Sequence, residues 1–251
     1  MKQTILIAAL AVVLIGCTHQ PTRYSATQSR TATDDLIEFF DSYWDKSCTV
    51  GNELQKSELF DQQQRDLMKL MDSVAIFQGL SGKISNIRKI KETKNTVLVS
   101  YDIDVENKSN SIVSLSLTCY NTFADAKNDS LYMSIVSIPD NSTVYFDGVF
   151  AVDDETNLPE YRNFGYYLSF SSQDYVFNVV NISKEKTDTL SPALIDALRA
   201  ARQSVMYIRQ NPDKARSTIS NNYKKEFDKA EAKLTDKEKA YLKRYMVAVM
   251  N

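Results

Sequence analysis

Histidine is almost absent from this 251-residue chain, which contains one copy, His19. The rest of the chain therefore has no Ser-His-Asp or Cys-His catalysis, no zinc centre built from histidine and no histidine general base. Glycine is scarce too, with six copies, and only Gly79 and Gly82 lie close together. The chain has neither a GxSxG elbow nor a glycine-rich phosphate loop. We expect a non-enzymatic protein with no cofactor and no metal centre.

Neither sign of charge is in excess. The 30 basic and 32 acidic residues give a net charge of −2, which provides no general attraction to nucleic acid, and we expect no nucleic-acid partner. The contents of 43% hydrophobic and 25% charged residues are ordinary for a globular protein. A chain of this length can hold one medium domain or two small ones.

Long apolar runs are missing except at the N-terminus. The run Ile5–Ile15 follows the positive residue Lys2 and is too short to span a bilayer, which takes ~20 apolar residues. A charged start, a short apolar core and a small residue at the cleavage point are typical of a secretory signal peptide, which we predict over residues 1–16. Residues 14–17, Leu-Ile-Gly-Cys, resemble the bacterial lipobox. The alternatives are an ordinary signal peptide with a chance cysteine, or a buried apolar segment.

The lipobox resemblance implies a lipid anchor on Cys17. In that family the thiol receives diacylglycerol, the chain is cleaved after Gly16 and the cysteine becomes the N-terminus. Two acyl chains make a lasting anchor, since each buried methylene contributes ~0.8 kcal/mol. In the enterobacterial members of that family, an Asp after the cysteine retains the lipoprotein at the inner membrane. The resemblance with Thr18 in this position therefore favours the outer membrane, facing the periplasm. Residues 17–33, which are rich in Thr, Ser and Gln, are then expected to form a flexible tether.

Two cysteines remain, Cys48 and Cys119. An even pair in an oxidising compartment favours a disulfide. The bond would close a loop of about 70 residues and stabilise the fold by on the order of 4 kcal/mol in the chain-entropy model. The alternative is two buried thiols, because cysteine packs as a small apolar residue.

Helical spacing of apolar residues predicts N-terminal helices over residues 34–78. Thr33 is expected to cap the first helix, which opens with Asp34 and Asp35 at the positive end of the helix dipole. The second is expected over Glu53–Asp72.

Helices are also predicted over residues 185–251. Ser191 is expected to cap the first of them, with Pro192 at the first helical position. Thr235 and Glu238 form a capping-box pattern. We expect the apolar stripes of these helices to pack on the central domain or on each other; a partner helix is the alternative.

Between the helices, residues 79–184 are rich in Val, Ile, Tyr and Phe, and apolar residues alternate with polar ones. This pattern predicts antiparallel strands. A helix is expected over Phe123–Ile138, between the third and fourth strands. The order resembles an OB-fold barrel, and a generic β-sandwich is the alternative. The predicted fold is therefore α+β, a small antiparallel barrel or sandwich flanked by helices. The expected strands are Lys83–Ile90, Thr96–Val105, Ser111–Tyr120, Ser142–Val152 and Tyr166–Ile182.

Basic residues gather on the first expected strand. OB-folds bind oligonucleotides or oligosaccharides over such a surface, so these residues are candidates for binding an anionic or glycan ligand of the cell envelope. The alternative is a charged edge strand on which lysines discourage aggregation. The candidate ligand-binding residues are Lys83, Arg88, Lys89 and Lys91.

Acidic residues form two groups. Asp102, Asp104 and Glu106 alternate on one strand and should share a face. They partly match a calcium loop, but Asn107 stands where that loop needs glycine. Residues 153–155 are the second group. Paired acids hydrolyse glycosides when set ~5–10 Å apart, whereas acids on a solvent-facing surface have no such role.

Together these features indicate a non-enzymatic lipoprotein of the cell envelope. We expect a binding or assembly module for an envelope protein or glycan, in the periplasm or at the cell surface, attached to the membrane through the lipid on Cys17. The alternative is a carboxylate-based hydrolase that acts on an envelope polymer.

Overall fold

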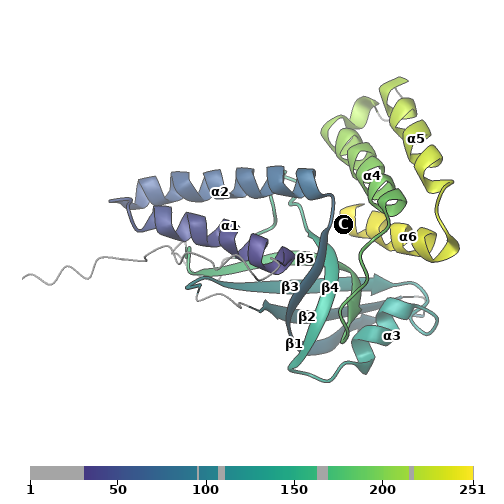
Figure 1. Cartoon of the computed structure of the whole chain (residues 1–251), viewed down its shortest axis with the longest axis horizontal. Helices are drawn as coiled ribbons and strands as arrows, with labels where there is room; N and C mark the ends of the chain where they lie inside the picture. The colour runs from purple at the N-terminus through teal and green to yellow at the C-terminus, as the bar shows by residue number, and fades with distance from the viewer. Residues whose placement is uncertain (1–30, 95, 107–110, 163–168, 215–217, 251) are drawn as a thin grey trace, which may run out of the picture.

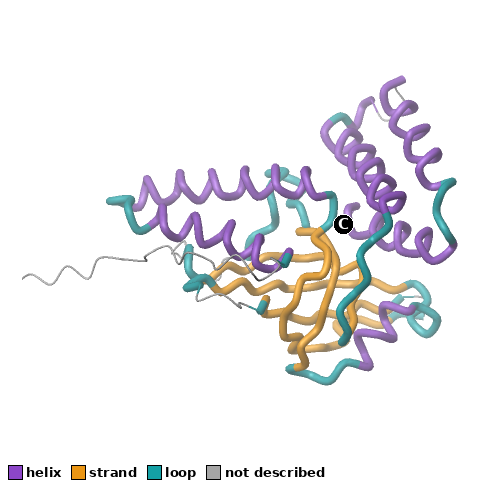
Figure 2. The backbone as a smooth tube through the Cα atoms, viewed as in Figure 1, coloured by secondary structure: helices purple, strands orange, loops and turns teal. Residues whose placement is uncertain are grey.

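The computed structural model describes residues 31–94, 96–106, 111–162, 169–214 and 218–250. The predicted signal peptide, Cys17, His19 and nearly all of the predicted tether lie outside these residues. Five strands wrap round one another at the centre of the molecule (Figures 1 and 2). A pair of N-terminal helices lies at one end of this ring, and the C-terminal helices lie against its outer side.

The strands form one closed, mixed sheet. They pair in the order β1-β2-β3-β5-β4, and β4 pairs again with β1. All pairs are antiparallel except β3 with β5, which is parallel, so the prediction of a wholly antiparallel sheet is wrong. The alternative of two stacked sheets is wrong as well. Register shifts in β1 and between β4 and β5 make the ring irregular. The strands are β1 (Phe77–Glu92), β2 (Val97–Val105), β3 (Ser114–Phe123), β4 (Ser142–Phe150) and β5 (Ser172–Ser183).

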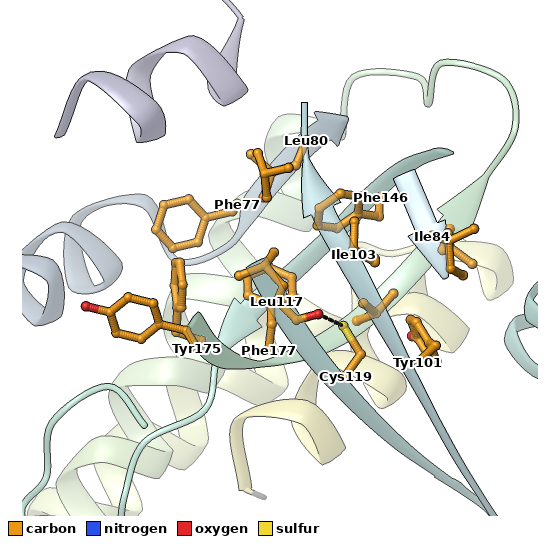
Figure 3. Packing of buried hydrophobic residues seen from close by; sticks show 14 of the residues in the cluster. Phe77, Leu80, Ile84, Tyr101, Ile103, Leu117, Cys119, Phe146, Tyr175 and Phe177 are labelled. Atoms are coloured by element: carbon orange, nitrogen blue, oxygen red, sulfur yellow. Dashed lines mark hydrogen bonds between the residues drawn. The ribbon is translucent and has the colours of Figure 1, made fainter. Parts of the chain in front are cut away.

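The main hydrophobic core fills the ring (Figure 3). Alternate residues point inward, such as Tyr101 and Ile103 on β2 and Leu117 on β3, and each has no solvent exposure. Phe146 and Phe177 meet edge to face with their ring centroids 5.8 Å apart. Burying a large apolar side chain contributes about 1.5–3 kcal/mol, so this core holds the ring closed.

The expected disulfide is not formed in the described part of the chain. Cys119 points into the core of the ring, and its thiol donates a 3.6 Å hydrogen bond to the carbonyl of Leu117 (Figure 3). Cys48 is exposed at the end of the first helix. Burial raises the pKa of the Cys119 thiol well above its ordinary value, which keeps the thiol protonated.

The N-terminal helices are α1 (Ala32–Ser47) and α2 (Glu53–Val74). The cap of α1 is Thr31, two residues before the predicted cap, and it forms a capping box with Asp34. Thr33 has another role, because its hydroxyl accepts a 3.0 Å hydrogen bond from the backbone of Ser81 on β1. A tertiary contact therefore uses the side chain that was expected to cap the helix.

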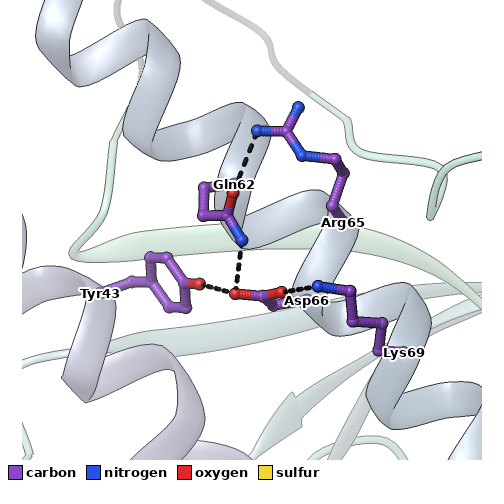
Figure 4. A network of polar contacts seen from close by, with 5 residues as sticks. All are labelled: Tyr43, Gln62, Arg65, Asp66 and Lys69. Carbon is purple, nitrogen blue, oxygen red and sulfur yellow. Dashed lines mark hydrogen bonds and ion pairs between the residues drawn. The ribbon is translucent and has the colours of Figure 1, made fainter.

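A polar network centred on Asp66 joins the two N-terminal helices (Figure 4). Its carboxylate accepts hydrogen bonds from Lys69 at 2.8 Å, from Tyr43 at 2.6 Å and from Gln62 at 2.8 Å. These donors, Lys69 foremost, hold the pKa of Asp66 well below its usual range. Because Tyr43 comes from α1 and the other residues from α2, the network fixes the spacing of the pair.

The remaining helices are α3 (Ser130–Ser137) between β3 and β4, then α4 (Pro192–Gln210), α5 (Thr218–Glu231) and α6 (Asp236–Met250). Ser191 caps α4 with Pro192 in its first turn, as predicted, and the capping box of Thr235 and Glu238 is present. A second core lies between these helices and the outer side of the ring, where Leu198 and Tyr245 pack with Val180 of β5.

A buried carboxylate, Asp147 of β4, links the ring to α6. It accepts hydrogen bonds from the backbone N–H of Gly79 at 2.7 Å, from Asn181 at 3.2 Å and from the hydroxyl of Tyr241 at 3.0 Å. Burial raises its pKa, and this effect outweighs the donors that favour the charged form. This contact fixes α6 against the strands, and α6 is one wall of the candidate site.

Candidate functional site

A cleft of about 480 Å³ opens between β3, α3 and α6. We call it the β3–α6 cleft. It is bounded by residues 120–125 and 128–131 on one side and by residues of α6 on the other, with Asn178 and Val179 of β5 between them. The α6 residues are Ala240, Lys243, Arg244, Val247 and Ala248. Its volume falls within the range of about 300–1,000 Å³ that is typical of ligand sites.

The cleft exists because β3 and β5 separate. Their parallel pairing ends at Cys119 and Phe177, and from Phe177 onward β5 pairs with β4. β3 continues as a strand to Phe123, where it still pairs with β2. The side of β3 that faced β5 therefore has no registered strand partner over residues 120–123, within the part of the chain described. The ring is open at this point, and α6 lies across the opening.

Six consecutive residues, 120–125, line the cleft, and the first four belong to β3. Successive side chains of a strand point to opposite faces, so a groove over one face contacts only every second residue. Contact with an uninterrupted run indicates that the cleft follows the edge of β3. The main-chain N–H and C=O groups at an unpaired strand edge can form hydrogen bonds with another chain.

Side-chain amides bridge the separation between the strands. Asn121 donates a 3.0 Å hydrogen bond to the carbonyl of Val179 and accepts one of 2.7 Å from the hydroxyl of Tyr101. Burial raises the pKa of Tyr101 well above 10, so the hydroxyl stays a donor. Asn178 donates to the carbonyl of Ala248 at 2.8 Å and attaches the end of α6 to β5. These bonds fix the cleft walls before any ligand binds.

The two walls carry opposite charges. Asp125 and Asp129 lie on the α3 side, where Asp129 caps α3 by accepting from two backbone N–H groups at 2.8 and 3.2 Å. Lys243 and Arg244 lie on α6. Arg244 donates to the carbonyl of Val180 at 3.0 Å and to the hydroxyl of Ser130 at 3.2 Å, which joins the walls at one point. Lys243 is exposed at the rim.

The outer side of α6 is partly apolar. Val247 is 44% exposed and Met250 is 55% exposed. A second hollow, of about 580 Å³, lies on the other side of this helix, between α5 and α6, and shares Ala240, Lys243 and Val247 with the cleft. The exposed ridge of α6 therefore stands between two hollows, which makes it accessible to a partner from either side.

The basic residues predicted as ligand-binding lie apart from the β3–α6 cleft, and their binding role stays a prediction. Lys83, Arg88, Lys89 and Lys91 are all exposed on β1, and none of them lines the hollows described here. The Nζ of Lys89 forms an ion pair with Glu92 at 2.7 Å. Register shifts of β1 fall between Ser85 and Arg88 and between Lys89 and Lys91.

The acids on β2 face outward, as predicted. Asp102 and Asp104 accept hydrogen bonds from Thr118 at 3.2 Å and Ser116 at 2.9 Å on β3. Asp174 of β5 lies near them, and its pKa is raised, chiefly by burial. No three acidic, cysteine or histidine residues are arranged to hold a metal ion in the described segments.

The acids in the loop after β4 make local contacts. Asp153 accepts from the backbone and hydroxyl of Thr156, each at 2.8 Å, and Asp154 pairs with Arg209 at 3.2 Å. Neither acidic group lines the β3–α6 cleft. The two acidic groups predicted from the sequence therefore lie outside this cleft.

Sequence reasoning missed the cleft because it assigned residues 123–138 to one helix. The structure has strand to Phe123, a turn, and then α3 from Ser130. The signal was present in the polar run of residues 124–130, in which Asp129 is a good helix cap before Ser130.

Comparison with known proteins identified no relative. The chain matches no protein-family model, and it has no match among curated proteins or solved structures. No helix in the described segments has the length and apolar character needed to cross a membrane.

Proposed function

We propose that this protein is a membrane-tethered, non-catalytic binding module that holds an envelope protein in the β3–α6 cleft. The tether is the lipid-modified Cys17, and the domain lies in the periplasm at the outer membrane. The observation that carries the proposal is the cleft itself, whose walls are already fixed by the amides of Asn121 and Asn178. Preorganised walls reduce the entropic cost of binding.

We further infer a relationship to OB-folds. The strand order β1-β2-β3-β5-β4, with α3 between β3 and β4, supports it. OB-folds bind ligands chiefly over the outer face of the second and third strands. Here that face carries Asp102 and Asp104, which disfavour a polyanion. The cleft beside β3 is the better binding surface in this chain.

A photo-cross-linking amino acid in place of Val247 tests the proposal in cells that make the full-length protein. Val247 is 44% exposed at the cleft rim. We expect a discrete cross-linked adduct after irradiation. The matched control carries the same amino acid in place of Leu54, which is 71% exposed on α2 and distant in the sequence from the cleft residues.

A second variant separates the cleft from the rest of the surface. Ala240→Trp adds a large ring to an exposed position that lines the cleft, so it should fill the cleft without disturbing the core. It should abolish the adduct at Val247. No adduct at Val247, or the same adduct at Leu54, would contradict the proposal.

A further inference from the structure

We propose that the occupant of the β3–α6 cleft is an extended polypeptide segment, which adds to the open edge of β3 as a further strand. This inference rests on the proposed function of the cleft and specifies its ligand. Residues 120–123 continue β3 beyond the point where β5 leaves it, so one edge of a regular strand faces the cleft.

The edge supplies the affinity. Strand addition is a general mode of peptide recognition in which main-chain hydrogen bonds bind the peptide and pockets select its alternate side chains. Because β2 pairs with β3 as far as Phe123, the strand already has the extended backbone that an added strand requires. A helical or compact ligand would leave the N–H and C=O groups of this edge without regular partners.

The walls supply the selectivity. In an added strand, successive side chains point in opposite directions. One row would face Lys243 and Arg244 on α6, and the other would face Asp125 and Asp129 on the α3 side. Charge complementarity therefore favours a peptide with acidic residues in one alternate row and basic residues in the other. A uniformly acidic or uniformly basic peptide meets repulsion from one wall.

The apolar part of the cleft also contributes to selectivity for the side chains of the peptide. Tyr120 is 37% exposed on β3, and Val247 is 44% exposed on the α6 wall. An apolar side chain of the peptide can cover both. The proposed ligand is thus an extended segment with alternating charge and at least one apolar or aromatic anchor, provided by another protein of the envelope.

Random twelve-residue peptides displayed on phage test this inference on the detergent-solubilised full-length protein. Selection uses the wild-type protein, and counter-selection uses the Ala240→Trp variant. We expect enriched peptides with opposite charges in alternate positions. Failure to enrich any peptide on the wild type over the variant would overturn the inference.

The most enriched peptide is then synthesised in two N-methylated forms. In an added strand, alternate backbone N–H groups face the edge, and the others face away. Methylation of the edge-facing set should weaken binding about tenfold or more, because two or more hydrogen bonds are lost, while the other set should change the Kd less than about threefold. Equal effects of the two sets would overturn strand addition.

Hydrogen exchange gives an independent readout. Amides of residues 120–123 that face the cleft should gain protection when the peptide binds, whereas residues 97–101 of β2 should not change. The outcomes also separate the two proposals. A Val247 adduct with an envelope protein, combined with equal effects of the two N-methylated sets, would leave the cleft as a protein-binding site but overturn strand addition. Absence of any Val247 adduct in the wild-type background would contradict both proposals.

Discussion

The hydroxyl of Tyr241 on α6 donates a 3.0 Å hydrogen bond to the carboxylate of Asp147 on β4. Asp147 has no solvent exposure and Tyr241 has 8%. The bond therefore joins the C-terminal helices to the ring at a dry point, where a missing partner cannot be replaced by water. Because α6 is also a wall of the cleft, Asp147 helps to position the candidate site although it does not line the cleft.

Asp147→Ala should destabilise the protein strongly. The backbone N–H of Gly79, the amide of Asn181 and the hydroxyl of Tyr241 would lose their acceptor, and an unsatisfied buried group costs about 1–3 kcal/mol. We expect the free energy of unfolding to fall by about 3 kcal/mol in urea denaturation followed by circular dichroism. The exposed Asp140 provides the control, since Asp140→Ala should change the value by less than about 0.5 kcal/mol.

The same carboxyl predicts a pH dependence. Its pKa is raised in the folded protein, chiefly by burial, so folding favours the protonated form. The stabilisation is complete below the unfolded pKa of about 3.9 and is lost as the pH rises through the folded pKa. The stability of the wild type relative to Asp147→Asn, which does not titrate, should therefore decrease as the pH rises above about 4. A constant or increasing difference would contradict the assignment.

Removing Asp72 should lower the free energy of unfolding more than removing an exposed carboxylate from a similar ion pair. It accepts two hydrogen bonds from Arg202, at 2.9 and 3.1 Å, and the arginine side chain is only 5% exposed. Asp72→Ala leaves that cation buried without its carboxylate. Since Asp72 is itself 53% exposed, solvent limits the expected cost to about 2 kcal/mol.

The matched control for this pair is Asp196→Ala. Asp196 and Arg199 are both more than half exposed and lie 4.0 Å apart, so the loss should be below about 0.5 kcal/mol. Both variants are compared by thermal and urea unfolding. Equal losses of unfolding free energy for the two substitutions would show that the ion pair of Asp72 with Arg202 stabilises the protein no more than an exposed pair does.

Cys17→Ser tests the anchor. The variant should fail to incorporate labelled palmitate and should leave the membrane fraction, because a serine hydroxyl cannot form the thioether. Cys48→Ser is the control, since Cys48 is exposed on the folded domain. It should be labelled and should partition as the wild type does. A Cys17→Ser protein that still sediments with membranes would refute the lipid anchor.

Local signals predicted the helices well. Ser191 and Pro192, and the pair Thr235 and Glu238, specify helix starts through contacts within four residues, so the sequence alone is sufficient. Thr33 shows the limit of this reasoning. Threonine is a favoured N-cap residue, but the hydroxyl of Thr33 accepts a hydrogen bond from the backbone of Ser81 on β1, and Thr31 caps the helix.

The arrangement of the ring and the position of the cleft could not be predicted in the same way. Alternation of apolar and polar residues indicated the strands, but the parallel pairing of β3 with β5 joins segments far apart in the sequence. Nothing near Cys119 indicates where that pairing ends. The cleft depends on this end point and on α6, so its residues share no sequence pattern. The lysines of β1 form an obvious pattern but do not line the cleft.

The closure of the ring has a consequence for the rate of folding. β1 must find β4, and β3 must find β5, before the core is sealed, and each search spans a long stretch of chain. Proteins dominated by such non-local pairing fold on a scale of about milliseconds to seconds. While the ring is incomplete, both edges of β3 are open to foreign strands, and after closure only residues 120–123 keep that property. Closure of the ring thus limits the open edge of β3 to one short segment.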